Sequence, residues 1–351
     1  MEVYQSSQVI GIDLGDKYGH VCCLDTATGE ITEGRVTMNP KAIAKHFGKS
    51  KARLVAIEVG THSRWVSHVL QGLGLDVIVA NPRRLQLITK SDSKNDRADA
   101  ELLARLAAAD RRLLSPVHHR SDRTQADLAI LKARDSFVKS RTGMVNQVRG
   151  LTKSFGVRLK KCSPVSFPNH VRGEIPVLLV PAVLPLLEAI QTQTRQIKAF
   201  DRKITKICEE RYPETKSLLQ IRGVGPITAL AFVLVLEDPS RFKTSRAVGA
   251  YLGLRPRQND SGMIQKQLRI TKAGNPFLRR LLVQCAHYIM GPFGEDCDLR
   301  RWGRSLAMRG GKNARRRAVV AVARKLATVL HRLWITQDEY QPLRNQEQVA
   351  A

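Results

Sequence analysis

Two short apolar segments constrain the fold of the first third of the chain, because each contains a single carboxylate. They are residues 10–15 (IGIDLG), which include Asp13, and residues 55–60 (VAIEVG), which include Glu58. A carboxylate within an apolar strand is unfavourable unless it is paired or binds a metal, and a nearby glycine lets a phosphate backbone approach closely. The pattern predicts two buried strands that carry candidate metal ligands.

The neighbouring segments predict a mixed α/β sheet. Apolar runs bounded by turn residues favour strands at 9–14, 20–24, 31–38, 54–59 and 75–80, and helical spacing favours helices at 40–47, 63–73 and 96–106. Three strands in a meander, followed by alternating helix and strand, is the order expected of an RNase H-like fold. We assign this α/β domain to residues 1–115.

Asp96 and Asp99 lie three residues apart at the start of a predicted helix, so both project from one face. Together with Asp13 and Glu58 they could hold two Mg²⁺ ions, or Mn²⁺, around a scissile phosphate, because hard cations prefer oxygen ligands. Each residue also has a plainer explanation, such as a helix N-cap for Asp96 or a buried ion pair for Glu58. As a set in this strand order, they favour metal catalysis.

The middle of the chain, residues 120–212, is predicted to be helical. Apolar residues recur at three- and four-residue steps over 122–151 and again over 186–208, with a break rich in proline and glycine at 163–185. Two long helices joined by a loop are typical of an antiparallel pair or a coiled-coil seam. A plain helical hairpin and an oligomer contact explain this pattern equally well.

Residues 216–337 are predicted to form a mostly helical C-terminal domain, followed by a polar, flexible tail at 338–351. Gly223 and Gly225 precede a helix in a GVGP sequence that resembles a helix-hairpin-helix element. In such elements free backbone N–H groups hold a DNA phosphate. A tight interhelical turn explains the two glycines equally well.

Residues 254–262 read as a polar loop that contains Ser261 within a basic region. A serine there could attack phosphorus if its proton is removed, although by composition alone a turn serine is the commoner explanation.

The charge predicts a polyanionic partner. The chain has 351 residues with 58 Lys+Arg against 31 Asp+Glu, a net charge of +27. The balance is 14 against 13 in residues 1–110, 22 against 11 in 111–240, and 22 against 7 in 241–351. We therefore expect the last two thirds to bind nucleic acid by phosphate contacts. The candidate contacts are Gly223, Gly225, Arg255, Arg257, Lys266, Arg269, Lys272, Arg279, Arg280, Arg315, Arg316 and Arg317.

The six cysteines lack the CxxC spacing of zinc sites, and there is no secretory signal. They are typical of buried thiols in a reducing cytoplasm. Apolar stretches are interrupted by proline, glycine or arginine, so no membrane partner is expected. The expected location is the bacterial cytoplasm, in association with the nucleoid.

Several motifs, read together, resemble the transposases of the insertion-sequence one-ten family, also called DEDD transposases or bridge-RNA-guided recombinases. The N-terminal motifs are GID at 11–13, IE at 57–58 with Gly60, and KNDRADA at 94–100. The C-terminal motifs are IRGVGP at 221–226, RF at 241–242, AYLGLRP at 250–256, SG at 261–262 and TKAGN at 271–275. The resemblance covers nearly the whole chain.

The resemblance implies a RuvC-type first domain with Asp13, Glu58, Asp96 and Asp99 as the metal-binding tetrad. It also implies that Ser261 is a catalytic serine, which becomes joined to DNA phosphate and conserves bond energy for rejoining. The family acts as an oligomer, here a dimer or tetramer, through the helical middle. A structured RNA made by the element pairs with donor and target DNA, so base pairing reads sequence while protein reads shape.

Two other functions remain open at this point. A RuvC-like junction-resolving nuclease would use metal-activated water and need no serine. A non-enzymatic nucleic-acid-binding scaffold would need only the positive charge.

Overall fold

The chain divides into two units, Met1–His119 and Arg120–Ala351, and each has its own hydrophobic core. The computed structural model describes residues 8–50, 52, 54–82, 95–261 and 264–345. The mixed sheet predicted for the first part and the helical character predicted for the remainder are both confirmed.

The first unit is built on a five-stranded sheet with the order β3-β2-β1-β4-β5. Strands β1, β2 and β3 form an antiparallel meander, whereas β4 runs parallel to β1 and β5 runs parallel to β4. The strands are β1 (Gln8–Leu14), β2 (Tyr18–Asp25), β3 (Ile31–Thr37), β4 (Leu54–Glu58) and β5 (Asp76–Ala80).

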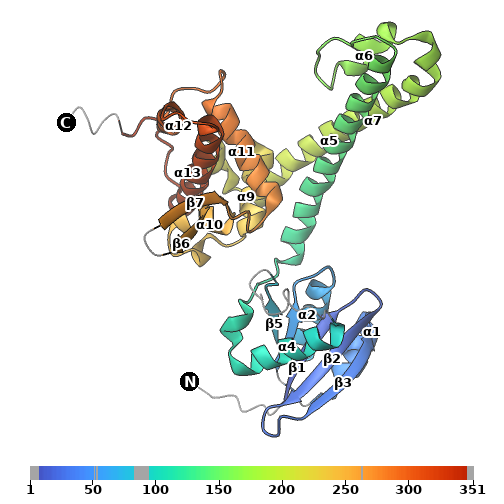
Figure 1. The fold of residues 1–351 in the computed structure, drawn as a ribbon, viewed down its shortest axis with the longest axis vertical. Coiled ribbons are helices and arrows are strands. Elements are labelled where there is room, and N and C mark those ends of the chain that lie inside the picture. Colours follow the sequence, from blue (N-terminus) through green and yellow to red (C-terminus); the bar gives the residue numbers. More distant parts are fainter. Residues whose placement is uncertain (1–7, 51, 53, 83–94, 262–263, 346–351) are drawn as a thin grey trace. The chain divides into compact units, whose positions relative to one another are not determined.

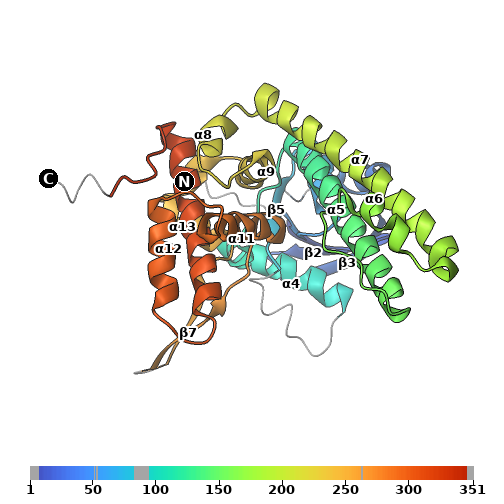
Figure 2. The same ribbon diagram turned by 90° about the horizontal axis from the view of Figure 1, so that it is seen from above.

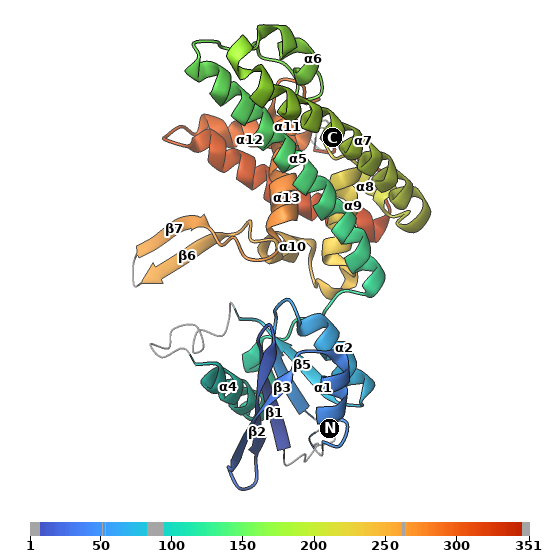
Figure 3. The ribbon, with the colours of Figure 1, turned by 90° about the vertical axis from the view of Figure 1, so that its right-hand side faces the viewer.

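Helices cover both faces of this sheet (Figure 3). Helices α1 (Pro40–Phe47) and α2 (Ser63–Gly72) pack on one face, where Ile10 and Ile12 of β1 join their core. Helix α4 (Asp96–Ala109) and the short η1 (Arg111–Leu114) cover the other face, where Val9 lies in the same cluster as Leu103. Alternate residues of β1 therefore point to opposite faces, as the period of a strand requires.

Gly11 is the point of closest approach between β1 and α4. A Cβ atom at this position would collide with the carbonyl oxygen of Ala100 and would lie 2.6 Å from the backbone nitrogen of Ala104. The absence of a side chain thus lets the helix backbone rest directly on the strand. This contact fixes the start of α4 beside the end of β1.

Two long helices dominate the first part of the second unit (Figure 1). Helices α5 (Asp122–Ser154) and α7 (Val180–Arg211) run side by side in opposite directions. The segment at their far end contains α6 (Phe167–Val171), η2 (Arg172–Glu174) and η3 (Val177–Leu179). The expected helix pair is therefore present, and subunit contacts through it remain a prediction.

Helix α7 begins earlier than the sequence suggested, because two prolines occupy its first turns. Pro181 lies in the first turn, where a missing N–H costs no hydrogen bond, while Pro185 lacks the N–H that would bond the carbonyl of Pro181. Among the described residues, the segment Val177–Arg211 is long and apolar enough to cross a membrane. Val183, Leu187 and Ile190 of that segment are buried in a cluster with residues of α5.

A buried polar clasp joins the start of α5 to the end of α7. Asp127 is 2% exposed and accepts hydrogen bonds from Arg211 Nη1 at 2.8 Å and from the Tyr212 hydroxyl at 3.0 Å. Burial and the adjacent carboxylate raise the pKa of Tyr212 to about 12, so its hydroxyl remains a donor. The clasp holds the open ends of the two helices together.

The rest of the second unit packs around α9 (Pro226–Leu236), which is buried on all sides from Thr228 to Leu236. Figure 2 shows α11, α12 and α13 gathered beside it. The remaining elements are α8 (Thr215–Leu219), η4 (Pro239–Arg241), α10 (Ser245–Tyr251), β6 (Pro256–Ser261), β7 (Ile264–Ile270), α11 (Pro276–Met290), α12 (Asp298–Met308) and α13 (Ala314–Thr336).

Two segments differ from their sequence-based predictions. Residues 254–262 were expected to form a loop, but Pro256–Ser261 is the strand β6, because backbone pairing with β7 needs no apolar side chains. Residues 338–345 were expected to be a loose tail, but they contact the helical body. The backbone N–H of Tyr340 donates to Gln220 Oε1 at 2.7 Å, and the N–H of Asp298 donates to the Pro342 carbonyl at 2.8 Å.

We expect Gly11→Ala to lower the stability of the first unit by about 1–3 kcal/mol, because the new methyl group would push α4 away from β1. Thermal and denaturant unfolding would measure this loss. Gly34→Ala in β3 is the matched control, since no atom lies within 4 Å of the position that its new methyl group would take. Equal stability of the two variants would contradict the close-contact explanation.

Candidate functional site

Asp13 and Glu58 lie at the ends of neighbouring parallel strands. The register pairs Ile12 of β1 with Ile57 of β4, so the two carboxylates follow one residue later on each strand. Both side chains are partly buried. Asp13 alternates with Gly11 along β1, which puts it on the face of the sheet that α4 covers.

Glu58 occupies the same face of the sheet. It alternates with Leu54 and Ala56, and both of these belong to the cluster that contains Leu103 of α4. Their intervening neighbours Val55 and Ile57 pack in the opposite core with α1 and α2. The alternation therefore directs Asp13 and Glu58 toward α4.

Asp96 and Asp99 are in the first turn of α4, and the residue that caps this helix is Asn95. The Asn95 side chain accepts a hydrogen bond from the Arg97 N–H at 3.1 Å. Asp96 is therefore not needed as the N-cap, which was its plainer interpretation. Asp99 directly precedes Ala100, whose carbonyl meets Gly11.

His20 links this helix start to the sheet, and it is not among the residues predicted from the sequence. It pairs with Asp13 in the antiparallel register of β1 and β2, and its Nε2 lies 3.7 Å from Asp96 Oδ2. His20 is 13% exposed and Asp96 is 65% exposed. Register counting from Asp13 across a predicted hairpin could have identified His20.

A second histidine connects the loops that follow β1 and β4. The Trp65 indole donates to His62 Nδ1 at 3.0 Å, so the ring proton is on Nε2. That Nε2 lies 3.5 Å from Asp16 Oδ1. The contact ties together the chain segments that come directly after the two carboxylate-bearing strands.

The donors in this region suit a hard divalent cation, because Asp13, Glu58, Asp96 and Asp99 offer carboxylate oxygens and no thiolate. In the described part of the chain, no group of three or more histidine, cysteine or acidic side chains is arranged to hold a metal ion. The fit therefore rests on donor chemistry and on the shared face of the sheet.

Ser261 is the last residue of β6, in an antiparallel ribbon with β7, and pairs with Ile264. The motifs at 250–256 and 271–275 form the base of this ribbon. The N–H of Lys272 donates to the Gly253 carbonyl at 3.0 Å, and Gly253 has φ +70° with no room for a Cβ beside Ala273. Two motifs that are distant in sequence thus meet where the ribbon leaves the body.

Gly223 and Gly225 form the turn between α8 and α9. Gly223 has φ +98°, and a Cβ there would lie 2.6 Å from the Tyr288 ring, so this position requires glycine. Gly225 is the residue before α9 and has an extended backbone. The turn is compatible with the predicted helix-hairpin-helix element and with an ordinary tight turn.

The candidate nucleic-acid-binding cations differ in how the protein uses them. Arg279 Nη1 donates to the carbonyls of Leu252 at 2.9 Å and Ala273 at 2.7 Å, so it braces the base of the ribbon. Arg255 donates to Gln258 Oε1 at 2.9 Å. The Lys266 side chain lies outside the described part of the structure. The candidate nucleic-acid-binding cations with exposed side chains are Arg255, Arg257, Arg269, Lys272, Arg315, Arg316 and Arg317.

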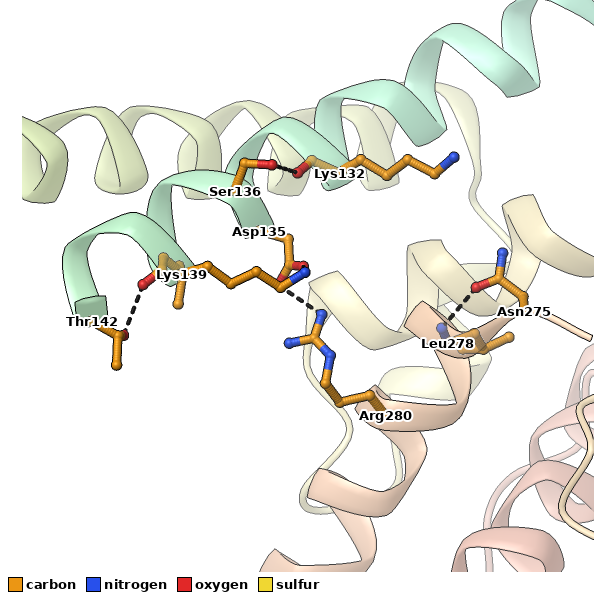
Figure 4. Close-up of polar contacts among 9 residues, drawn as sticks. Lys132, Asp135, Ser136, Lys139, Thr142, Asn275, Leu278 and Arg280 are labelled. Atoms are coloured by element: carbon orange, nitrogen blue, oxygen red, sulfur yellow. Dashed lines mark hydrogen bonds and ion pairs between the residues drawn. The ribbon is translucent and has the colours of Figure 1, made fainter. Parts of the chain in front are cut away.

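Arg280 pairs with Asp135 across α11 and α5 (Figure 4). Its Nη2 lies 2.7 Å from Asp135 Oδ1, and Lys139 Nζ lies 2.9 Å from Oδ2. Burial alone would raise the pKa of Asp135, but hydrogen bonds from the two cations outweigh it and hold this pKa below its ordinary value.

After Asp298, the first residue of α12, the rest of the last two helices and the segment between them contain basic residues and no acidic ones. Between Leu299 and Gln337 the chain has 11 Lys+Arg and no Asp or Glu. Arg300 is buried and caps α11 through the carbonyls of Ile289 and Gly291. Exposed cations in this stretch are Arg301, Arg304, Arg309, Lys312, Arg315, Arg316, Arg317, Lys325 and Arg332.

Comparison with known proteins gives matches in both units. The family model described as "Transposase IS116/IS110/IS902 family" matches residues 215–295, and the model "Transposase", of the DEDD type, matches residues 10–156. The chain is 27% identical to the transposase for insertion sequence element IS1111A of Coxiella burnetii, over 95% of this chain and 91% of that protein.

Two further relatives extend the comparison. The transposase for insertion sequence element IS1328 of Yersinia enterocolitica is 29% identical over 80% of this chain and 84% of its own length. The pilin gene-inverting protein of Moraxella lacunata is 24% identical over 92% of this chain and 94% of its own length.

We expect Asp135→Asn to destabilise the second unit by about 1–3 kcal/mol at neutral pH, because the uncharged amide loses the attraction to both cations and turns an NH₂ donor toward one of them. The folded-state pKa of Asp135 is lowered, so its stabilisation is present above the ordinary value of 3.8 and is lost as pH falls below it. Melting curves of both proteins should therefore converge in acid. Glu188→Gln, at an exposed position of α7, is the control and should match the parent throughout.

Proposed function

The chain belongs to the IS116/IS110/IS902 family of transposases, and we propose that it moves its own insertion sequence by site-specific cutting and rejoining of DNA. As a transposase it is a phosphoryl-transfer enzyme. Its place of action is then the bacterial cytoplasm, at the nucleoid where its substrate lies.

The metal-binding residues of this proposal are Asp13, Glu58, Asp96 and Asp99. The observation that carries it is that β1 and β4 end side by side, with their carboxylates on the face that α4 covers. Mg²⁺, as a pair of ions, or Mn²⁺ would neutralise charge on the attacking and leaving oxygens. His20, whose Nε2 lies 3.7 Å from Asp96 Oδ2, would help to orient Asp96 in this proposal.

The nucleophile of this proposal is Ser261. Its hydroxyl oxygen would form a bond to phosphorus while the bond from phosphorus to one deoxyribose oxygen breaks, and the serine proton would leave to a base. The resulting ester keeps the phosphodiester bond energy for rejoining. Support comes from the position of Ser261 on a ribbon whose base is braced by Arg279.

Two finer assignments of the fold also belong to this proposal. A meander of three strands continued by two parallel strands supports an RNase H-like, RuvC-type first domain. The turn at Gly223 and Gly225, directly before α9, supports a helix-hairpin-helix-like element that would hold a DNA phosphate.

The partners of this proposal are donor DNA, target DNA, a structured guide RNA and further copies of the chain. The excess of positive charge in the last two thirds supports contact with a large amount of phosphate. Division of labour between a guide RNA and a shape-reading protein would explain why this charge is spread widely. A dimer or a tetramer would assemble through α5 and α7.

Ser261→Ala separates the proposed reaction from hydrolysis by metal-activated water. We expect this variant to lose strand exchange and the covalent protein–DNA intermediate, while DNA and RNA binding remain. Asp13→Asn should lose every cleavage product. Thr32→Ala, at an exposed hydroxyl-bearing residue of β3, should behave as the parent.

Recombination assays and denaturing gels for protein-linked DNA provide these measurements. A Ser261→Ala protein that still nicks DNA through hydrolysis would favour a junction-resolving nuclease. Normal recombination by that variant would refute the serine mechanism. Absence of any cleavage by the parent chain with its nucleic acids and metal would favour a binding scaffold.

Chelation of divalent metal should stop DNA cleavage because the carboxylate set would lose the cations that stabilise the transition state. Addition of Mg²⁺ or Mn²⁺ should restore product, whereas Asp13→Asn should not recover at any metal concentration. Gel shifts should show that the protein still binds DNA in the chelator. Full cleavage in the chelator would contradict metal catalysis.

A further inference from the structure

The ribbon formed by β6 and β7 extends from the helical body as two strands without a third (Figure 3). Among the described elements, β6 is in broad contact with β7, and neither strand is in broad contact with any other helix or strand. An isolated two-stranded ribbon is at best marginally stable in water. Such a projecting element is expected to gain stability from a partner.

The base of the ribbon is held to the body by several close contacts. Arg279 bonds the carbonyls of Leu252 and Ala273, which precede and follow the ribbon in sequence. Gly274, with φ +69°, contacts the Tyr251 backbone so closely that a Cβ would not fit. The Tyr251 ring in turn packs 5.3 Å from the Phe242 ring.

The ribbon is rich in residue types that are suited to phosphates and base edges. Residues 255–272 contain five Lys+Arg and one Asp, together with four glutamine or asparagine residues. The backbone register places Gln258 opposite Gln267, and Leu268 and Arg269 together oppose Arg257 at a bulge. Arg257, Gln258 and Arg269 are exposed.

The shape of the ribbon discriminates between nucleic-acid helices. Paired strands are about 5 Å apart, and a ribbon of this width with its side chains fits the major groove of B-form DNA, about 12 Å wide. The major groove of A-form RNA is too deep and narrow for side chains to read. Arginine and glutamine are the residues that bond guanine and adenine edges in the DNA groove.

The geometry points to β6 and β7 as a ribbon that enters the major groove of duplex DNA, with Arg257 and Arg269 as its principal contacts. This inference rests on the proposed function in taking DNA as the substrate. It adds that the protein itself grips the duplex next to the residue proposed as nucleophile.

Arg257→Ala/Arg269→Ala in the full-length chain tests this role. The probes are a labelled DNA duplex of mixed sequence and an RNA duplex of the matching sequence, with binding followed by fluorescence anisotropy. We expect affinity for duplex DNA to fall about tenfold and the salt dependence to weaken by up to about two counterions. Affinity for the RNA duplex should change by less than about twofold.

Lys41→Ala/Lys45→Ala on the exposed side of α1 removes the same charge from the first unit and should leave DNA affinity within about twofold. Competition gives a second readout: methyl green, a major-groove ligand, should displace the parent protein more readily than distamycin, a minor-groove ligand. Circular dichroism would verify that each variant is folded.

Equal losses on DNA and RNA duplexes would overturn the groove assignment and make the ribbon a general polyanion contact. Unchanged DNA binding would overturn the contact altogether. These binding measurements need no cleavage, so their outcome is separate from that of Ser261→Ala. A chain that fails to recombine can still bind DNA through the ribbon. A chain that recombines can also bind DNA without the ribbon.

Discussion

The bare backbone contact between Gly11 of β1 and α4 is the constraint on which the first unit depends. With no side chain between them, the strand and the helix approach until the Ala100 carbonyl and the Ala104 nitrogen border the glycine. That approach brings the first turn of α4, with its two carboxylates, to the strand that carries Asp13 near its end. A larger residue at this position would preserve the sheet and still separate the acidic groups, so the proposed chemistry depends on a missing methyl group.

Much of the first unit could be predicted from its sequence, because its signals are local. Helix 40–47 was predicted with its observed bounds, since Asn39 and the following proline mark its start. The strands with Asp13 and Glu58 were recognisable because an acid in an apolar run is rare. His20 and His62 were missed for the opposite reason: their contacts with Asp96 and Asp16 depend on register and loop closure, which a linear pattern does not contain.

Predictions for the second unit were less complete, and the reasons are again physical. The strands β6 and β7 are polar, so alternation could not reveal them, and their pairing rests on backbone hydrogen bonds. Arg279 and Arg280 were read only as nucleic-acid contacts, yet one braces backbone carbonyls and the other pairs with Asp135. The sequence alone does not distinguish an arginine or lysine that stabilises the fold from one that is available to bind nucleic acid.

The stretch from Leu299 to Gln337, which has no acidic residue, has a consequence for regulation. Its exposed charged side chains are arginines and lysines, residue types whose ordinary pKa values lie far above neutrality. A change of acidity within the cell would therefore leave this part of the surface as positive as before. Ionic strength, by contrast, acts on every one of these charges through the ion atmosphere of a bound phosphate chain. Salt, rather than protons, is the variable to which α12 and α13 can respond.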